Sequence, residues 1–229
     1  VGDLTSGVRG LLDKAGVRVI AGELRLTRPD EAVVSTTDGQ AKFLKFKDLV
    51  LATGSRPIEL PGFKVNSGAV LDSTGALKLK ELPKKVAIVG GGYIGLEIGI
   101  ALAKLGSKVA IVEALDGVLP TMDRRLAKPV EKRLSELGVD LYAKSKAASF
   151  ENGKLTINTP DGAKKLAVDR VIVAVGRKPN SDDLGLERAK IAVDNHGLIQ
   201  VGLDRRVSDH VAAIGDLTPG PALAHKASA

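Results

Sequence analysis

The segment "GGGYIG", residues 90–95, has the residue types and spacing of a turn that binds a pyrophosphate. In the pattern G-x-G-x-x-G, Gly90 allows a tight turn and Gly92 lets the main chain approach phosphate oxygens. Gly95 lets the helix that follows pack closely on the strand that precedes the turn. The start of that helix also favours anionic phosphates, because its N–H groups point outward. The other members of this predicted binding turn are Gly91, Tyr93 and Ile94.

Glu113 ends the next β-run, close to the ~20-residue spacing of an acid that accepts a hydrogen bond from a ribose 2′-hydroxyl. Its carboxylate would repel a 2′-phosphate. The first arginine that follows Glu113 is Arg124, so no arginine close by could bind such a phosphate. These residues favour NAD over NADP as the ligand of the turn.

The elements around the turn alternate between strand and helix from residue 84 onward, which predicts an α/β fold with a parallel sheet covered by helices. Apolar spacing predicts a helix over 92–105 and a second over 123–137. Asp123 is the expected N-cap of the second helix. Pro129 lies inside it and predicts a kink or a late start. A further amphipathic helix is predicted over 3–15.

Short β-runs fill most of the remaining chain, separated by turn signals such as "TDG", "ENG" and "PDG". They predict an antiparallel β-meander beside the parallel sheet. The β-runs are 17–22, 32–37, 42–46, 49–54, 139–143, 147–151, 154–159, 164–169 and 170–176.

Two segments of the chain resemble each other: "LVLATGSRP" at 49–57 and "VIVAVGRKP" at 171–179. Each is a buried-strand pattern that ends in Ala-x-Gly and is followed by Arg and Pro. Such a small-residue turn at the carboxyl end of a strand lets a ligand approach the main chain. Together with the glycine turn, the similarity suggests two related nucleotide-binding units.

The composition argues against several classes of protein. The net charge is +7, but the basic residues are interleaved with acids and only 3% of residues are aromatic, which disfavours nucleic-acid binding. No run approaches the ~18 apolar residues of a membrane span. The chain has no cysteine, which excludes thiolate metal sites within it and fits a cytoplasmic protein. Its three histidines have no metal-ligand spacing, so we predict no metal.

Four motifs in one order, "ATGSRP", "GGGYIGLEIG", "AVGRKPN" and "IGDLTPGPALAHKA", resemble the dihydrolipoamide dehydrogenase family of flavoprotein disulfide reductases. The resemblance extends over the whole chain. It implies a Rossmann-like NAD-binding domain inserted in a partial FAD-binding domain. On this map the expected domains are a partial FAD domain at 1–80, the NAD domain at 81–200, and a return toward the FAD and central region at 201–229.

The resemblance also implies roles for single residues near the two cofactors. Tyr93 would lie over the flavin and move aside for nicotinamide, and Glu97 would face both rings. Backbone contacts to the adenosine and ribose of NAD would come from Ser145 and Gly176. The residues implied for FAD are Leu24 near adenine, Thr53, Gly54, Asp216 as acceptor from a ribitol hydroxyl, and Ala224 along the flavin.

For the intact protein, the resemblance implies oxidation of protein-bound dihydrolipoamide, with hydride passing from FAD to NAD+. The implied partners are a lipoyl-bearing acyltransferase of a 2-oxo acid dehydrogenase complex and a second copy in a homodimer. The family's redox cysteine pair and its C-terminal interface domain are expected outside these residues. We therefore expect no catalytic residue within the chain, which is interpreted as a middle fragment and as inactive alone.

Two other interpretations share the predicted fold or the predicted nucleotide site but differ in function. A mercuric or glutathione-type reductase, a transhydrogenase or an NADH oxidase would have the same fold and a different substrate. A non-catalytic NAD-binding module would retain only the nucleotide site. The "GPALAHKA" segment favours the dihydrolipoamide reading.

Overall fold

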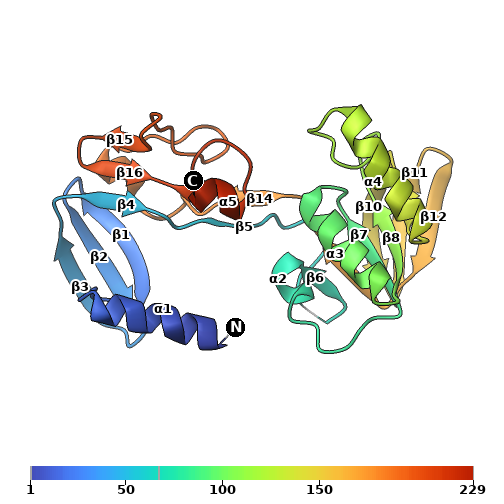
Figure 1. The fold of residues 1–229 in the computed structure, drawn as a ribbon, viewed down its shortest axis with the longest axis horizontal. Coiled ribbons are helices and arrows are strands. Elements are labelled where there is room, and N and C mark those ends of the chain that lie inside the picture. The colour runs from blue at the N-terminus through green and yellow to red at the C-terminus, as the bar shows by residue number, and fades with distance from the viewer. Residues whose placement is uncertain (1, 67, 229) are drawn as a thin grey trace. The chain divides into compact units, whose positions relative to one another are not determined.

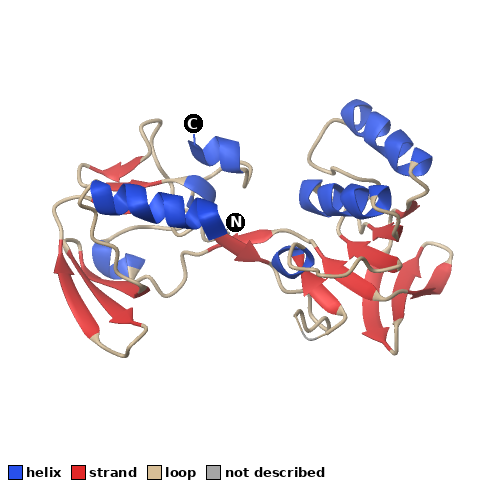
Figure 2. Cartoon of the chain, turned by 60° about the horizontal axis from the view of Figure 1, so that its bottom comes forward, coloured by secondary structure: helices blue, strands red, loops and turns tan. Residues whose placement is uncertain are grey.

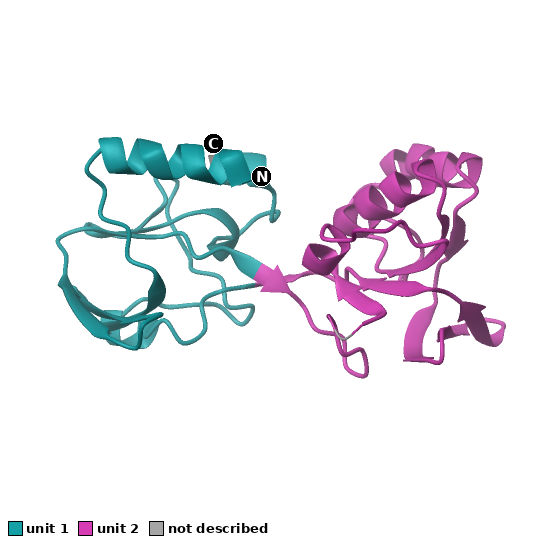
Figure 3. Cartoon of the chain, turned by 90° about the horizontal axis from the view of Figure 1, so that it is seen from below, with its two compact units in different colours: residues 1–55, 179–229 teal, residues 56–178 magenta. Residues whose placement is uncertain are grey.

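The structure, a computed structural model, describes residues 2–66 and 68–228. The chain forms two compact units, shown in different colours in Figure 3. Unit 1 comprises residues 1–55 and 179–229, and unit 2 comprises residues 56–178. Unit 2 is therefore a continuous segment inserted between the two halves of unit 1.

Unit 2 is built on a five-stranded parallel sheet with the strand order β6-β13-β7-β8-β9. Its central strands are continuous apolar runs because both faces are covered, as is usual for parallel sheets; Val86, Ile88, Ile111 and Ile172 are fully buried. The strands are β6 (Val70–Asp72), β7 (Lys85–Val89), β8 (Lys108–Val112), β9 (Asp140–Tyr142) and β13 (Arg170–Val173).

The helices of unit 2 are α2 (Ser73–Ala76), α3 (Tyr93–Lys104) and α4 (Arg124–Glu136). The two long helices, α3 and α4, lie together on one side of its strands (Figure 2). The predicted helices over 92–105 and 123–137 are confirmed by α3 and α4. Asp123 caps α4 by accepting from the Arg125 N–H at 2.8 Å. The helix begins directly after this cap with Pro129 inside it, so the late start allowed by the sequence does not occur.

The predicted antiparallel meander is also present in unit 2, as β10 (Lys146–Glu151), β11 (Lys154–Thr159) and β12 (Gly162–Ala167). The turns lie at "ENG" and "PDG", as the sequence predicts. Leu155 and Ile157 of β11 are fully buried and share a core with residues of β7 and β13. This packing joins the meander to the parallel sheet.

Unit 1 contains two small sheets around a core that includes Leu26, Ile199 and Leu217. In the first sheet, β1 (Gly22–Arg28), β2 (Glu31–Thr36) and β3 (Ala41–Lys45) run antiparallel. In the second, β16 (Val211–Ala213) lies between antiparallel β15 (Arg206–Ser208) and parallel β4 (Leu49–Leu51). The helices of unit 1 are α1 (Gly2–Lys14), the 3-10 turns η1 (Leu186–Ala189) and η2 (Gly215–Leu217), and α5 (Ala224–Ser228).

The two similar segments of the sequence meet in the fold. Their ends form β5 (Ser55–Pro57) and β14 (Arg177–Pro179), which pair as a two-stranded sheet (Figure 1). The boundary of the two units falls within these strands. The chain thus leaves and re-enters unit 1 through the two related motifs.

One predicted strand is wrong. Residues 17–20 have no regular structure, and β1 instead covers Gly22–Arg28. Val17 and Val19 are exposed, so no sheet face selects their alternating apolar pattern. In β1, Leu24 and Leu26 face the core and alternate with polar residues, a pattern that the sequence analysis missed.

The compact units also have other bounds than the predicted domains, which began at 81 and 201. Residues 70–72 form β6 of the parallel sheet and therefore belong to unit 2. Residues 179–200 belong to unit 1, where the Leu26 N–H donates to the Leu184 carbonyl at 2.7 Å. The assignment of the units to cofactor domains stays a prediction. Across the described residues, no helix is both long and apolar enough to cross a membrane.

Candidate nucleotide-binding site

The glycine turn connects β7 to α3 at the carboxyl edge of the parallel sheet of unit 2. Gly90 has φ +111°, which favours glycine, and a Cβ there would lie 2.4 Å from the Ala174 carbonyl oxygen at the end of β13. A Cβ on Gly95 would lie 2.1 Å from the Gly90 carbonyl oxygen. Both glycines are therefore required by close main-chain packing, as their spacing predicts. The turn lies between β13 and β8, where the strand order changes direction, the usual ligand position in such sheets.

Gly92 is the open part of the turn. It is the N-cap of α3, and no described side chain caps the helix at this position. Apart from its chain neighbours and the helix backbone, no heavy atom of the described residues lies within 4 Å of the place where its Cβ would be. The first N–H groups of α3 have no acceptor within the helix. This end of α3 therefore fits a phosphate group that approaches the main chain.

Two N–H groups of the turn are already satisfied within the protein. The Gly90 N–H donates to the Val112 carbonyl at 2.9 Å. The Gly91 N–H donates to Glu113 Oε2 at 2.6 Å. Donors to a phosphate therefore begin at Gly92, which refines the predicted site.

Glu113 lies beside the glycine turn, as the sequence predicts. The residue is only 7% exposed, and its Oε1 accepts from the Leu115 N–H at 2.8 Å while Oε2 accepts from Gly91. Two backbone donors thus fix the position of a nearly buried carboxylate. A carboxylate has about four acceptor positions, so each oxygen can accept a further hydrogen bond.

Two of the other residues predicted for NAD lie at the same edge. Ser145 is buried, and its N–H donates to the Glu113 carbonyl at 2.9 Å, which joins the segment after β9 to the end of β8. Gly176 follows β13 with φ +123°, and its carbonyl accepts from the Ile58 N–H at 3.0 Å. The fold therefore brings the ends of β7, β8, β9 and β13 together around the turn.

Tyr93, Ile94 and Glu97 occupy the start of α3. Tyr93 and Glu97 are four residues apart, so their side chains lie on the same face of the helix. Tyr93 is half-buried and Glu97 is exposed. This face has one aromatic ring and one carboxylate directly after the open part of the turn.

In unit 1, Thr53 and Gly54 follow β4 and are held by Asn180. Thr53 Oγ1 donates to the Asn180 carbonyl at 2.8 Å, and Asn180 Nδ2 donates to the Thr53 carbonyl at 2.9 Å. The Asn180 N–H donates to the Gly54 carbonyl at 2.9 Å. Three hydrogen bonds thus join the first of the two similar segments to Asn180, the residue that directly follows the second.

Asp216 lies in η2, and its Oδ2 accepts from Ser55 Oγ at 2.5 Å. Leu24 is half-buried in β1 and Ala224 begins α5. Because Ser55 follows Thr53 and Gly54, the structure brings this predicted group to Asp216. Leu24 packs instead against the core of unit 1 that includes Leu26 and Leu217.

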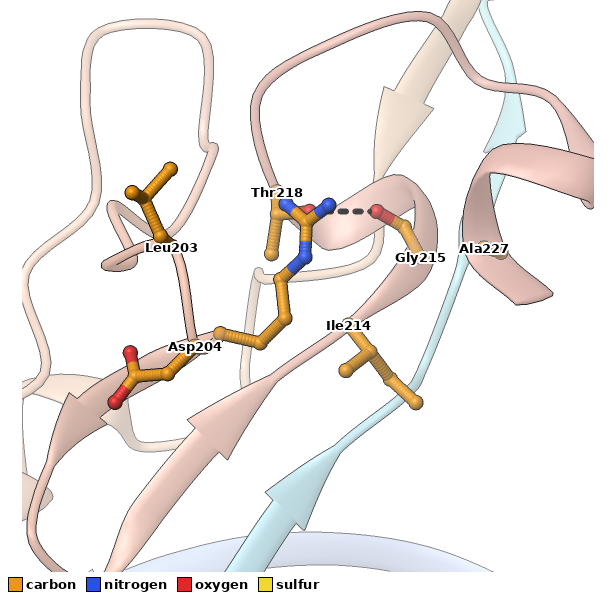
Figure 4. A pocket seen from close by; sticks show the side chains of 7 residues that line it. Leu203, Asp204, Ile214, Gly215, Thr218 and Ala227 are labelled. Carbon is orange, nitrogen blue, oxygen red and sulfur yellow. Dashed lines mark hydrogen bonds between the residues drawn. The ribbon is translucent and has the colours of Figure 1, made fainter. Parts of the chain in front are cut away.

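A pocket of about 310 Å3 lies in unit 1 next to η2 (Figure 4). It is formed by residues 203–205, Ile214, Gly215, Thr218 and Ala227. Thr218 Oγ1 donates to the Gly215 carbonyl at 2.9 Å, the dashed line in Figure 4. The residues that line it do not include those predicted for NAD or FAD.

Sequence reasoning missed three structural partners of the predicted residues. Asn180 and Ser55 lie inside the motifs "AVGRKPN" and "ATGSRP", but neither had a role. Leu119 was also missed; its N–H donates to the Gly91 carbonyl at 2.9 Å. No local pattern identifies such contacts, because each joins segments that are far apart in the sequence or separated by an irregular loop.

The chain is similar to known proteins over nearly its whole length. The chain matches the family described as pyridine nucleotide-disulphide oxidoreductase over residues 1–229. It is 44% identical to the dihydrolipoyl dehydrogenase of Geobacillus stearothermophilus over 98% of its length, and 40% identical to that of Bacillus subtilis over all of it. These alignments cover 48% and 49% of the relatives, so the chain spans about half the length of the curated relatives it matches.

A solved structure is similar over nearly the whole chain. The HOCl-induced flavoprotein disulfide reductase RclA of Escherichia coli matches with a TM-score of 0.84 and 31% identity, covering 97% of this chain and 51% of that one. The predicted α/β fold and family are confirmed, and the predicted cofactors NAD and FAD are those that this family uses. The chain belongs to the pyridine nucleotide-disulphide oxidoreductase family.

Proposed function

We propose that unit 2 binds NAD at its glycine turn and that unit 1 supplies part of an FAD site. The observation that carries the proposal is the Glu113 carboxylate, which two backbone N–H groups hold beside Gly91. A nearly buried acid at this place accepts well from a ribose 2′-hydroxyl and repels a 2′-phosphate. The ligand is therefore NAD, and NADP is disfavoured.

In this proposal the pyrophosphate lies at Gly92 and the N-terminus of α3, where the partial positive charge of the helix favours it. Gly92 itself leaves that place open, because the position of a Cβ there has no described heavy atom within 4 Å apart from its own chain neighbours and the helix backbone. Glu113 orients the adenosine ribose. The Ser145 N–H donates to the main-chain carbonyl of Glu113 and so helps to hold Glu113 in position. The chain's own residues thus bind one end of the nucleotide and direct the other end along α3.

When bound, NAD+ would supply the hydride acceptor and reduced FAD the hydride donor. The face of α3 that presents Tyr93 and Glu97 is the proposed neighbour of the nicotinamide. Thr53, Gly54 and Asp216 are the proposed FAD contacts in unit 1, with Leu24 and Ala224 at the two ends of that cofactor. The contact between Ser55 and Asp216 supports a common site for this group.

For the whole protein, we propose oxidation of dihydrolipoamide carried by the acyltransferase of a 2-oxo acid dehydrogenase complex, with a homodimer as the working form. The names of the relatives support this substrate. The 229 residues contain no cysteine and so have no thiol to exchange with the substrate. The chain alone is therefore proposed to bind NAD without oxidising dihydrolipoamide.

The test is titration of the purified chain with NAD and NADP by calorimetry. The chain is expected to bind NAD more tightly than NADP. Glu113→Ala should weaken NAD by about tenfold, the value of one or two charge-assisted hydrogen bonds, and should remove the preference. Asp116→Ala is the matched control, because Asp116 is an exposed carboxylate in the same loop, paired with Lys144 at 3.4 Å.

Unchanged NAD affinity in Glu113→Ala, or an equal loss in Asp116→Ala, would contradict the proposed role of Glu113. The visible absorption spectrum after incubation with FAD tests the second cofactor. Flavin bands that remain after gel filtration would support a partial FAD site, and turnover of dihydrolipoamide by the chain alone would contradict the proposed inactivity.

A further inference from the structure

The loop between β8 and α4, residues 114–122, forms a wall of the glycine turn. The Leu119 N–H donates to the Gly91 carbonyl at 2.9 Å. Val118 is fully buried, and its Cγ1 lies 3.2 Å from the place where a Cβ on Gly91 would be. The N–H of Gly91 in turn donates to Glu113. A shift of this loop would therefore move Gly91, whose carbonyl accepts from Leu119 and whose N–H donates to Glu113.

An ion pair from α4 lies against this loop. Arg124 Nη2 donates to Glu131 Oε1 at 2.7 Å, and Arg124 Nη1 approaches the Val118 carbonyl oxygen at 3.4 Å. The two side chains are 48% and 26% exposed, so Glu131 is the more enclosed partner. The pair thus connects the first and second turns of α4 to the loop.

Gly117 leaves room for the ion pair beside the loop backbone. A Cβ on Gly117 would lie 2.4 Å from Arg124 Nη1 and 2.6 Å from Glu131 Oε1. A side chain at this position would force the charged ends of Arg124 and Glu131 to shift away from the loop backbone. The contact is therefore built from three positions: Gly117, Arg124 and Glu131.

We propose that Arg124 and Glu131 are positioning residues for the adenosine end of NAD. Their ion pair holds the β8–α4 loop on Gly91, and the loop holds Gly91 and the Glu113 carboxylate in the geometry that accepts the ribose. This inference rests on the proposed NAD site and deepens it. It also gives Arg124 a role other than binding a 2′-phosphate, because Glu131 and the Val118 carbonyl already accept from its guanidinium.

The test measures the affinity of the chain for NAD, ADP-ribose and nicotinamide mononucleotide. Arg124→Gln and Glu131→Gln are each expected to weaken NAD and ADP-ribose by about threefold to fivefold, the range of a partly exposed ion pair. Nicotinamide mononucleotide lacks the adenosine end, so its affinity should not change. The double variant should lose no more than the stronger single variant, because the two residues act as one unit.

Arg133→Gln is the matched control. Arg133 pairs with Glu136 at 3.0 Å on the same helix, with 52% and 47% of the side chains exposed. This variant should bind NAD as the parent does. Gly117→Ala should reproduce the loss without any change of charge, because its new methyl group displaces the pair.

Two results would overturn the inference while leaving the NAD site intact: normal NAD and ADP-ribose affinity in Arg124→Gln, or an equal loss in Arg133→Gln. An equal loss for nicotinamide mononucleotide would also overturn it, since this result indicates general damage to the domain. Circular dichroism of each variant checks its folding. If the parent chain binds no NAD, the proposed function itself fails, which is a different outcome.

Discussion

The glycine turn of unit 2 and the predicted FAD residues of unit 1 differ in the size and burial of the sheets that support them. The turn lies at the edge of a five-stranded parallel sheet whose central residues Ile88, Ile111 and Ile172 are fully buried. In unit 1, β4 belongs to a three-stranded sheet, and Val50 is 61% exposed. No residue of α1 that the structure describes is buried; Leu4 is 77% and Leu11 is 68% exposed.

This difference separates two kinds of predicted site. At the glycine turn, the residues expected to bind NAD contact each other through main-chain packing and through Glu113. In unit 1, Thr53, Gly54 and Asp216 are joined through Asn180 and Ser55. The first arrangement has a defined geometry before any ligand binds. We expect unit 2 to bind its nucleotide independently and the FAD residues to need further support.

The largest effect is expected from Gly95→Ala. Its methyl group would lie 2.1 Å from the Gly90 carbonyl oxygen, so the turn must move. We expect NAD affinity to fall by at least about tenfold and the free energy of unfolding to fall by about 3 kcal/mol. Gly99→Ala is the control, because a Cβ there makes ordinary contacts at 3.5–3.6 Å. Calorimetry and urea denaturation measure both quantities, and equal effects of the two changes would contradict the close-packing argument.

The next comparison sets the sheet of unit 2 against α1 of unit 1. Ile111→Ala removes a fully buried side chain and should lower the free energy of unfolding of unit 2 by about 3 kcal/mol. Leu11→Ala changes an exposed side chain and should alter stability by no more than about 0.5 kcal/mol. Urea denaturation distinguishes them. A large loss in Leu11→Ala would mean that the apolar face of α1 is packed in solution.

A smaller effect is expected at the proposed FAD group. Ser55→Ala removes the hydroxyl that donates to Asp216, and should lower the free energy of unfolding of unit 1 by about 1 kcal/mol. Ser208→Ala, on β15, is an exposed control for which we expect little change. Thermal denaturation of both variants and the parent gives the comparison. Identical stability of all three would show that the contact between Ser55 and Asp216 contributes nothing measurable.

The smallest effect concerns the cap of α4. A hydrogen bond from the Arg125 side chain, and then one from its N–H, hold the pKa of Asp123 below its ordinary value of 3.8. Because the folded pKa is lowered, the stabilisation is complete above the unfolded pKa and is lost as pH falls through the folded pKa. We expect Asp123→Ala to lower the melting temperature slightly at neutral pH and not in strong acid. Asp123→Asn keeps a capping acceptor and should retain more stability; a difference between parent and Asp123→Ala that persists in strong acid would contradict the charge argument.

Much of unit 2 could be predicted from the sequence because its signals are local. The glycine spacing, the apolar strand before it and the helical pattern after it lie within one short segment, and each reflects a steric requirement of the main chain. Asp123 likewise identifies the start of α4 by itself. The missed strand β1 and the wrong strand predicted at 17–22 show the limit. Leu24 and Leu26 become a strand face only because β2 and η1 pack beside them, whereas Val17 and Val19 are exposed.

By itself, the sequence determined the family, the α/β class and the residues from which a pyrophosphate site can be built, because periodicity and glycine sterics act over a few neighbouring residues. Only the tertiary structure decided that β14 returns to pair with β5, that Gly91 donates to Glu113, and that Arg124 turns to Glu131. These contacts depend on strand order and loop path. Such features arise from the packing of many residues at once, and no short stretch of the chain encodes them.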